Sequence, residues 1–459
     1  VFEEFFIFSA GLAGLRASRT ELHAAPYETG CMDAFFRALP FRLTGAQNGV
    51  IEQILHDLSS GHVMNRLVQG DVGSGKTMAA ACFCAVKNGK QAAFMAPTEL
   101  LAEQHKKTLS ALLGPLGVHV LLLTGSKTPA QKRAAREKIA SGEAQLIIGT
   151  HALISTGVEF QSLGFGVAQR TRLTEKGDAP HLLVMSATPI PRTLALIAYG
   201  DLDVSVISEL PPGRQPVETF LVSEALRERL NVFIRKQCAE GHQVYIVCPA
   251  VEDGEENAIK SAESWAQTLR QEVFPDLRVG LVHGRMKSAE KDAALSAFRA
   301  GESDILVSTT VVEVGVDVPN ATLMVIENAE RFGLSQLHQL RGRVGRGGTD
   351  SWAFLISRAE DGGPAQQRLQ VIQGTLDGAQ IAQADLEFRG AGDVLGDAQS
   401  GGKSGLKLLR VVKDAKIIAD ARERAGRLLA DDPDLSGEVE LAGAVLDFTR
   451  GNETFLTSS

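Results

Sequence analysis

The run from Asn65 to Thr77 constrains the fold more than any other part of the sequence. It reads as an apolar strand, a glycine-rich turn of the form G-x-x-x-x-G-K-T, and a helix-prone stretch from Met78 onward. In such a turn, backbone N–H groups point at phosphates, the lysine reaches the β- and γ-phosphates, and the threonine hydroxyl can ligate Mg²⁺. Because the turn works only between a strand and a helix, it predicts an α/β fold that binds a nucleotide. The alternative is a glycine-rich turn beside a stray lysine. The phosphate-binding residues are Gly70, Asp71, Val72, Gly73, Ser74, Gly75, Lys76 and Thr77.

Length and composition set the outer limits. The 459 residues are too many for one core, and 44% apolar with 22% charged residues is typical of a globular chain. A net charge of −8 argues against coating nucleic acid over a broad surface, but it permits a narrow basic groove. Glu3 and Glu4 stand where a signal peptide would be basic, and no apolar run is long enough to span a membrane. We therefore expect a cytoplasmic protein with no membrane partner, and the start within a helical stretch predicts the downstream part of a longer protein.

Five cysteines are an odd number, and only Cys82 and Cys84 are close in sequence. A disulfide framework is not expected. Two residues apart on a helix, Cys82 and Cys84 point in different directions, which favours core packing over a metal site.

Strand-like and helical stretches alternate in two series, which predicts two parallel-sheet domains. The first series of expected strands is 91–96, 118–124, 145–149 and 181–186. A proline-rich turn at 209–214 precedes the second series, which is 243–247, 279–282, 305–308, 322–326 and 352–356. Beyond these, a helix is expected at 406–429. The predicted domains are a helical linker at 1–38, an ATP-binding RecA-like domain at 39–212, a second RecA-like domain at 213–357, and a C-terminal translocation hairpin and helical region at 358–459.

Only the first domain has a phosphate loop, whereas the second has an arginine cluster at 341–346. The forked guanidinium suits the charge of a transferring γ-phosphoryl group, so we expect the second domain to close over the nucleotide. The alternative is an exposed basic turn.

Six separated blocks, in order, resemble the helicase motifs of superfamily 2. They are Gly70–Thr77, Ala96–His105, Ser186–Leu194, His283–Lys287, Thr309–Asn320 and Arg341–Arg346. More narrowly, the chain resembles the RecG-type ATP-dependent DNA helicases, which migrate branches at stalled replication forks. The segments 39–47 and 385–392 favour that family over its relative, the transcription-repair coupling factor.

The resemblance implies a role for each matching residue. ATP with Mg²⁺ on Thr77 would be the cofactor, Lys76, Gln339, Arg343 and Arg346 would act on the γ-phosphate, and Arg341 would hold the loop. Phe41 and Gln47 would read the adenine, and Gly315 and Asp317 would face the nucleotide. Contacts to DNA would come from Pro97, Thr98, Thr150, His151, Thr188 and Thr309. Strand-end capping is the alternative for the threonines.

The family's translocation hairpin is matched by Arg368, Arg389 and Gln399. An ordinary solvated helix and loop is the alternative. The sequence departs from the pattern at Ala391, where a proline is usual, and at Ala398, where an arginine is usual.

The largest departure lies between Gly164 and Phe165. The family has a buried strand there that ends in Asp-Glu-Gln-His, and its carboxylates serve Mg²⁺ and the attacking water. Here the flanking residues are joined with neither strand nor acidic pair. Either the sequence closes over residues that the protein has, or they are deleted. We expect the first, because a lost central strand would leave a gap in the sheet.

The leading hypothesis is an ATP-dependent helicase or translocase that remodels branched DNA, meaning stalled forks and Holliday junctions, in recombination and repair. Its wedge domain would precede Val1, single-stranded-DNA-binding protein would be a partner, and the absence of heptads favours a monomer. The alternatives are a duplex-DNA translocase of the transcription-repair coupling type and an ATP-binding scaffold without hydrolysis.

Overall fold

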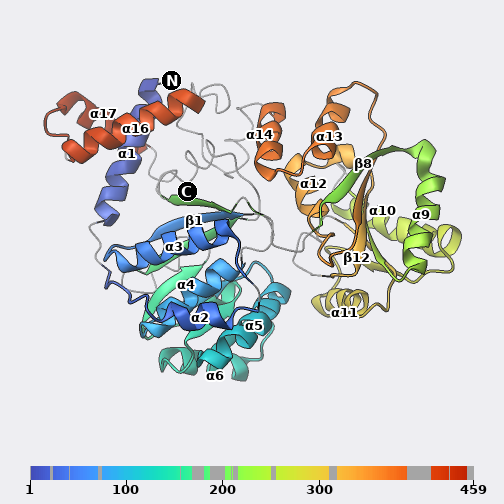
Figure 1. Cartoon of the computed structure of the whole chain (residues 1–459), viewed down its shortest axis with the longest axis horizontal. Coiled ribbons are helices and arrows are strands. Elements are labelled where there is room, and N and C mark those ends of the chain that lie inside the picture. The colour runs from blue at the N-terminus through green and yellow to red at the C-terminus, as the bar shows by residue number, and fades with distance from the viewer. Residues whose placement is uncertain are drawn as a thin grey trace. The chain divides into compact units, whose positions relative to one another are not determined.

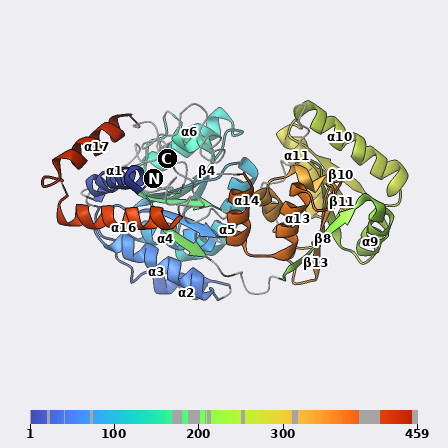
Figure 2. The ribbon, with the colours of Figure 1, turned by 90° about the horizontal axis from the view of Figure 1, so that it is seen from above.

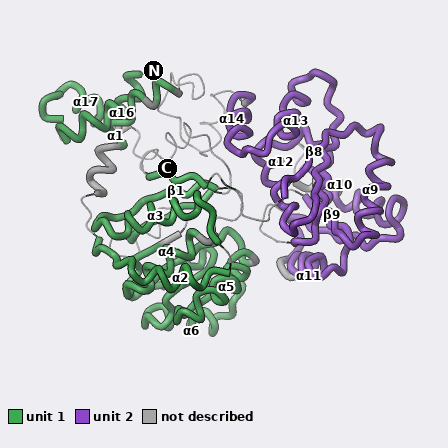
Figure 3. Tube along the Cα trace, viewed as in Figure 1, with its two compact units in different colours: residues 1–209, 389–459 green, residues 210–388 purple. Residues whose placement is uncertain are grey.

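The computed structural model divides the chain into two compact units (Figure 3). Unit 1 comprises residues 1–209 and 389–459, and unit 2 comprises residues 210–388. The structure describes residues 2–20, 24–40, 42–70, 75–155, 157–167, 180–186, 202–207, 209, 215–249, 255–309, 318–389, 415–433 and 435–451.

Unit 1 is built on a parallel sheet whose described strands run in the order β3-β4-β2-β5-β6-β1-β7. The order is typical of a doubly wound sheet, in which the chain moves outward in both directions from a central strand. The predicted α/β class is therefore confirmed for this unit. Its strands are β1 (Asn65–Gly70), β2 (Gln91–Met95), β3 (Val120–Leu123), β4 (Leu146–Gly149), β5 (Leu163–Val167), β6 (His181–Ser186) and β7 (Asp203–Ile207).

Strand β5 corrects the expectation of a gap at Gly164. The chain is continuous there, and the residues on both sides of the junction form the strand between β2 and β6. Leu163 pairs with Gln91 and Phe165 pairs with Ala92, so Gly164 is the extra residue of a β-bulge. The Tyr27 hydroxyl donates to the Gly164 carbonyl at 3.1 Å, and a Cβ at Gly164 would lie 2.3 Å from that hydroxyl. The shortened sequence thus closes the sheet with a bulge that only glycine fits.

The helices of unit 1 place the phosphate-loop helix at the centre of the core (Figure 1). Every residue of α4 from Met78 to Val86 is buried, Cys82 and Cys84 included, which confirms core packing for these two cysteines. Helix α4 packs on β2 and β5, and α3 packs on α4 and β7. Helix α1 packs against α16 and α17 from the other end of the chain. The helices are α1 (Phe2–Thr20), α2 (Met32–Ala38), α3 (Gly45–Ser59), α4 (Gly75–Lys87), α5 (Glu99–Leu113), η1 (Gly114–Leu116), α6 (Pro129–Ala140), η2 (His151–Ile154), α16 (Ala415–Asp431) and α17 (Val439–Gly451).

Unit 2 holds a second parallel sheet, with described strands in the order β10-β11-β9-β12-β13-β8. Its central strands are buried on both faces, and β9, β11 and β12 are buried at every position. The second predicted parallel sheet is confirmed. The strands are β8 (Val217–Ser223), β9 (Gln243–Val247), β10 (Val279–Val282), β11 (Ile305–Ser308), β12 (Ala321–Ile326) and β13 (Ser351–Ser357).

Helices of unit 2 flank the sheet, and α12, α13 and α14 follow one another along the chain around its C-terminal half (Figure 2). Helix α12 packs on α13, and α13 packs on η6 and β8. The helices are η3 (Glu224–Leu226), α9 (Arg227–Ala239), α10 (Glu255–Thr268), the π-helical turn η4 (Leu269–Val273), α11 (Ser288–Arg299), η6 (Ala329–Arg331), α12 (Leu334–Arg341), α13 (Pro364–Gly374) and α14 (Gly378–Arg389).

Two edge strands were not predicted, namely β7 and β8. Edge strands expose part of their apolar surface, and Val206 and Phe220 are 53% and 40% exposed. Their mixed composition therefore hides the strand pattern. The helix expected at 406–429 is described only from Ala415, and it continues to Asp431. Within the described residues, no helix is long and apolar enough to cross a membrane.

Candidate nucleotide and nucleic-acid site

The two flanks of the phosphate loop have the predicted geometry. Gly70 ends β1, which lies between β6 and β7, and α4 begins at Gly75. A Cβ at Gly70 would lie 3.0 Å from the Ile207 Cβ on the neighbouring strand, so the close approach of β7 favours glycine. Lys76 and Thr77 are in the first turn of α4, where the helix dipole favours an anion.

Thr77 carries a polar atom that the protein does not satisfy. Its side chain is fully buried, and its Oγ1 has no hydrogen-bond partner among the described residues. A buried hydroxyl without a partner is costly unless something else binds it. A Mg²⁺ ion that accompanies a triphosphate would supply that partner, so the site fits the cofactor.

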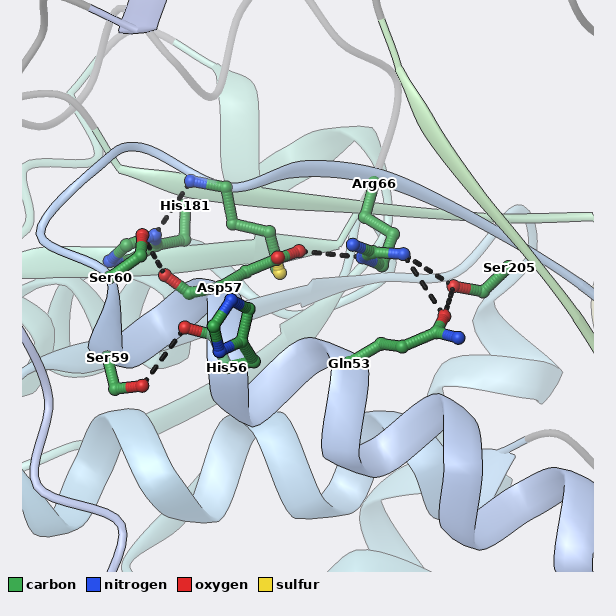
Figure 4. Close-up of polar contacts among 9 residues, drawn as sticks. Gln53, His56, Asp57, Ser59, Ser60, Arg66, His181 and Ser205 are labelled. Atoms are coloured by element: carbon green, nitrogen blue, oxygen red, sulfur yellow. Dashed lines mark hydrogen bonds and ion pairs between the residues drawn. The ribbon is translucent and has the colours of Figure 1, made fainter.

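Strand β1 is fixed by a buried polar network (Figure 4). The Arg66 guanidinium donates to Asp57 Oδ2 at 2.7 Å, to Ser205 Oγ at 2.7 Å and to Gln53 Oε1 at 3.2 Å. Gln53 and Asp57 belong to α3 and Ser205 belongs to β7, so one arginine joins three elements around the strand that leads to the phosphate loop. The sequence gave one signal for this network, which is an arginine within an otherwise apolar strand.

Gln47 has a structural use in addition to its predicted one. Its side-chain oxygen accepts from the Thr44 N–H at 3.0 Å, while its own N–H donates to the Thr44 hydroxyl at 3.2 Å. This capping box starts α3. An amide oxygen has two lone pairs, so contact with an adenine edge is still compatible with the cap. Glu209 also accepts from the first turn of α3, from Ala46 N–H at 3.1 Å, and that hydrogen bond lowers the pKa of Glu209.

The residues expected to contact DNA from unit 1 lie at one edge of the sheet. Strands β2 and β4 are parallel neighbours with Met95 opposite Gly149, so Pro97 and Thr98 lie beside Thr150 and His151. The Thr98 side chain caps α5 by accepting from Leu101 N–H, which agrees with the capping alternative. Pro97 and His151 are exposed at this carboxyl edge, where open α/β sheets bind ligands.

No acidic pair follows β5 in the sequence. After Glu159, the next Asp or Glu is Glu175, and β5 is followed directly by Ala168 and Gln169. The deletion is therefore real in this protein, contrary to our first expectation.

In unit 2, the predicted residues follow β11 and α12. Thr309 comes directly after β11, and its buried Oγ1 has no partner among the described residues. Gln339 is half-buried on α12, and Arg343 and Arg346 lie just beyond that helix. The Arg346 guanidinium donates back to the Gly342 carbonyl at 3.3 Å, which shapes this turn.

Three polar contacts tie α12 to the predicted hairpin. Arg341 is buried and its Nη1 donates to the carbonyls of Ile372 at 2.6 Å and Thr375 at 2.9 Å, at the end of α13. Arg368 donates to the Glu330 carbonyl at 2.6 Å, and Ser335 pairs with Asp385 of α14 at 3.2 Å. The sequence suggested that Arg341 holds its own loop, but it did not show that it also holds α13.

Several predicted site residues fall outside the described residues, namely Phe41, Asp71, Val72, Gly73, Ser74, Thr188, Gly315, Asp317 and Gln399. Gly75, Lys76 and Arg389 are placed on their helices, and their side chains are not described. Their roles stay predictions.

Three family models match consecutive parts of the chain. They are "DEAD/DEAH box helicase" at residues 44–169, "Helicase conserved C-terminal domain" at 224–348, and "ATP-dependent DNA helicase RecG, domain 3, C-terminal" at 375–442. A solved structure of RecG bound to a three-way DNA junction matches with a TM-score of 0.74 at 41% identity, over 91% of this chain and 56% of that one. S. cerevisiae Dbp5 bound to RNA and ADP BeF3 shares the fold, with a TM-score of 0.55 at 15% identity over 86% of this chain and 97% of that one.

The two parallel sheets, the phosphate-loop flanks and the two helicase-domain matches define a superfamily 2 helicase. The "ATP-dependent DNA helicase RecG" of Synechocystis sp. is 48% identical over 96% of this chain and 54% of that protein. The protein of that name from Escherichia coli K12 is 46% identical over 93% of this chain and 64% of that one. The chain belongs to the family of RecG-type ATP-dependent DNA helicases. It spans between about half and two thirds of the length of these curated relatives.

Proposed function

We propose that this chain carries the ATP-driven motor of a DNA helicase that remodels branched DNA, such as stalled forks and Holliday junctions, in recombination and repair. The observation that carries the proposal is the likeness, over 91% of the chain, to a RecG structure that holds a three-way junction. The match to the RecG-specific domain at 375–442 supports this function over that of the transcription-repair coupling type.

The proposed roles of the residues follow the family pattern. When ATP and Mg²⁺ are bound, they supply the phosphoryl group and the charge that neutralises it. Lys76 and Thr77 hold the phosphates and the ion, Gln47 reads the base, and Gln339, Arg343 and Arg346 contact the γ-phosphate. Pro97, Thr98, Thr150, His151 and Thr309 contact the DNA backbone, while Arg368, Arg389 and Gln399 serve translocation.

The missing acidic pair lowers the expected rate of hydrolysis. Phosphoryl transfer depends mostly on positioning and electrostatic stabilisation, which the lysine and arginines still provide. A general base contributes about 10²–10⁴-fold to such reactions. We therefore propose a slow ATPase, and a nucleotide-dependent scaffold without turnover is the second candidate because β5 closes the sheet with no carboxylate after it.

The substrates suggest a cytoplasmic protein. A monomer and a contact with single-stranded-DNA-binding protein stay part of the proposal.

Competition for branched DNA tests the proposed substrate. A fluorescent three-way junction bound to the chain would be displaced by unlabelled junction or by linear duplex of equal length and charge. We expect the linear duplex to compete at least about tenfold less well, which corresponds to about 1.4 kcal/mol of branch preference. Equal competition would show that the chain reads only the phosphate backbone, and it would contradict the proposed substrate class.

A further inference from the structure

Two cysteines that are far apart in sequence lie side by side in unit 1. Cys31 Sγ contacts the Glu28 carbonyl oxygen at 3.6 Å, and Cys84 Sγ contacts the same oxygen at 3.9 Å. Cys31 precedes α2 and Cys84 is in the third turn of α4, and these two helices pack together. Both thiols are free.

The backbone around this pair is held in place by Asn88. Its side chain accepts from Glu28 N–H at 2.7 Å and donates to the Glu28 carbonyl at 3.0 Å. The same amide group lies 3.8 Å from Cys84 Sγ. The segment that carries Cys31 is therefore fixed against the end of α4, so the proximity of the two sulfurs does not depend on a free loop.

Electrostatic coupling between the thiols gives a second sign of their proximity. Burial raises the pKa of Cys84 to about 12, and the neighbouring Cys31 raises it further. Burial is also the main cause of the raised pKa of Cys31, which a side-chain hydrogen bond with Cys84 partly opposes. Cys82, two residues away on α4, is fully buried and points elsewhere, so the pair is specific to Cys84.

We propose that Cys31 and Cys84 form an oxidisable dithiol that takes up a reversible disulfide bond from a low-molecular-weight disulfide. Cys31 reacts first because it is half-buried, whereas Cys84 is fully buried. The Cys31 thiolate attacks one sulfur of the small disulfide, breaks its S–S bond and releases one thiolate. Cys84 then attacks Cys31 Sγ and releases the second thiolate. The small disulfide is reduced to two thiols, which take the two protein protons, and the cysteine pair is oxidised.

The bond would join the segment before α2 to the helix that begins at the phosphate loop. It would enclose α2, α3 and β1 in one covalent loop, and restricting the unfolded chain in this way stabilises the folded unit. Thr77 lies two turns before Cys84, about 10 Å along the helix axis. We therefore expect unit 1 to become more stable while the nucleotide-binding end of α4 keeps its geometry.

Oxidised glutathione serves as the probe on the full chain. After incubation and alkylation, two of the five thiols are expected to be protected. Peptide mapping without reductant should then find one linked peptide pair containing Cys31 and Cys84. The melting temperature should rise by about 5 °C and return on reduction. Cys31→Ser should abolish both effects, whereas Cys238→Ser, a matched change at a half-buried thiol in unit 2, should retain them.

Other products would overturn the proposal. A stable glutathione adduct on Cys31 with Cys84 still reduced would show that the sulfurs cannot meet. A linked peptide with a different pair, or a melting shift that survives Cys31→Ser, would show that another thiol is responsible.

Discussion

At the scale of single residues, Thr77 combines an unsatisfied hydroxyl with a place in the first turn of the phosphate-loop helix. Thr77→Val keeps the shape of the side chain and removes the hydroxyl. Loss of an unpartnered buried polar group should leave the free energy of unfolding unchanged or slightly raise it. In contrast, Mg²⁺-dependent ATP affinity should fall at least about tenfold, because one ligand of the ion is lost. Calorimetric titration with and without Mg²⁺ measures this effect.

Thr77→Ser is the matched control, because it restores the hydroxyl. It should bind Mg²⁺-ATP as the unchanged chain does. If the valine variant also shows normal Mg²⁺ dependence, the hydroxyl is not an ion ligand and its burial needs another explanation.

His181 predicts an acid-sensitive step in stability. Its ring is buried, Nδ1 accepts from Met64 N–H at 3.0 Å, and burial lowers the pKa of His181 to about 4. An unfolded histidine has a pKa near 6.5, so between about pH 6.5 and pH 4 the unfolded chain binds the additional proton. The contribution is fully present above pH 6.5 and is lost as the pH falls toward 4. It amounts to at most about 3 kcal/mol.

Urea unfolding between pH 7 and pH 4 measures the His181 step. His181→Asn keeps an acceptor for Met64 N–H and removes the titrating ring, so its stability should fall less over this range. Identical pH profiles for the two proteins would rule out His181 as the source.

At the scale of elements, Arg341 joins α12 to the end of α13 through two carbonyls. Arg341→Lys keeps the charge but cannot span both acceptors, because an ammonium lacks the rigid fork. We expect a loss of about 2 kcal/mol in local stability, seen as faster amide hydrogen exchange at residues 375–380. Arg299→Lys, at an exposed position on α11 in the same unit, should leave that exchange unchanged.

The contacts also give Arg341→Lys a specific signature. The exchange increase should be confined to α13, α14 and the segment between them. A uniform increase across unit 2 would indicate global destabilisation and would remove the argument that Arg341 positions the hairpin.

The elements that could be predicted from sequence are those with strong local patterns. The central strands and α4 are continuous apolar runs, and the glycine-rich turn fixes what lies on each side of it. Strand β5 could not be predicted, because its pattern exists only once Leu163 and Phe165 lie in one line with Gly164 bulged between them. The Arg66 network and the Cys31–Cys84 contact bring together residues from separate elements, so only the folded chain shows them.

At the scale of the whole molecule, the family match and the missing acidic pair make different demands on the chain. The match predicts ATP-driven work on branched DNA, whereas the sequence after β5 offers no carboxylate for the attacking water. Inserting the family's strand with Asp-Glu-Gln-His between Gly164 and Phe165 should raise the turnover number about 10²–10⁴-fold. An unchanged turnover number would mean that another group of this chain already serves that role.

The rate of ATP hydrolysis by the unmodified chain tests the central claim most directly. It should be measured at saturating Mg²⁺-ATP with three-way junction DNA, with linear duplex of equal length, and without DNA, and Thr77→Val gives the background. The account predicts a slow rate above that background, which the junction raises more than the duplex does. A rate at background under all three conditions, or equal rates with junction and duplex, would contradict it.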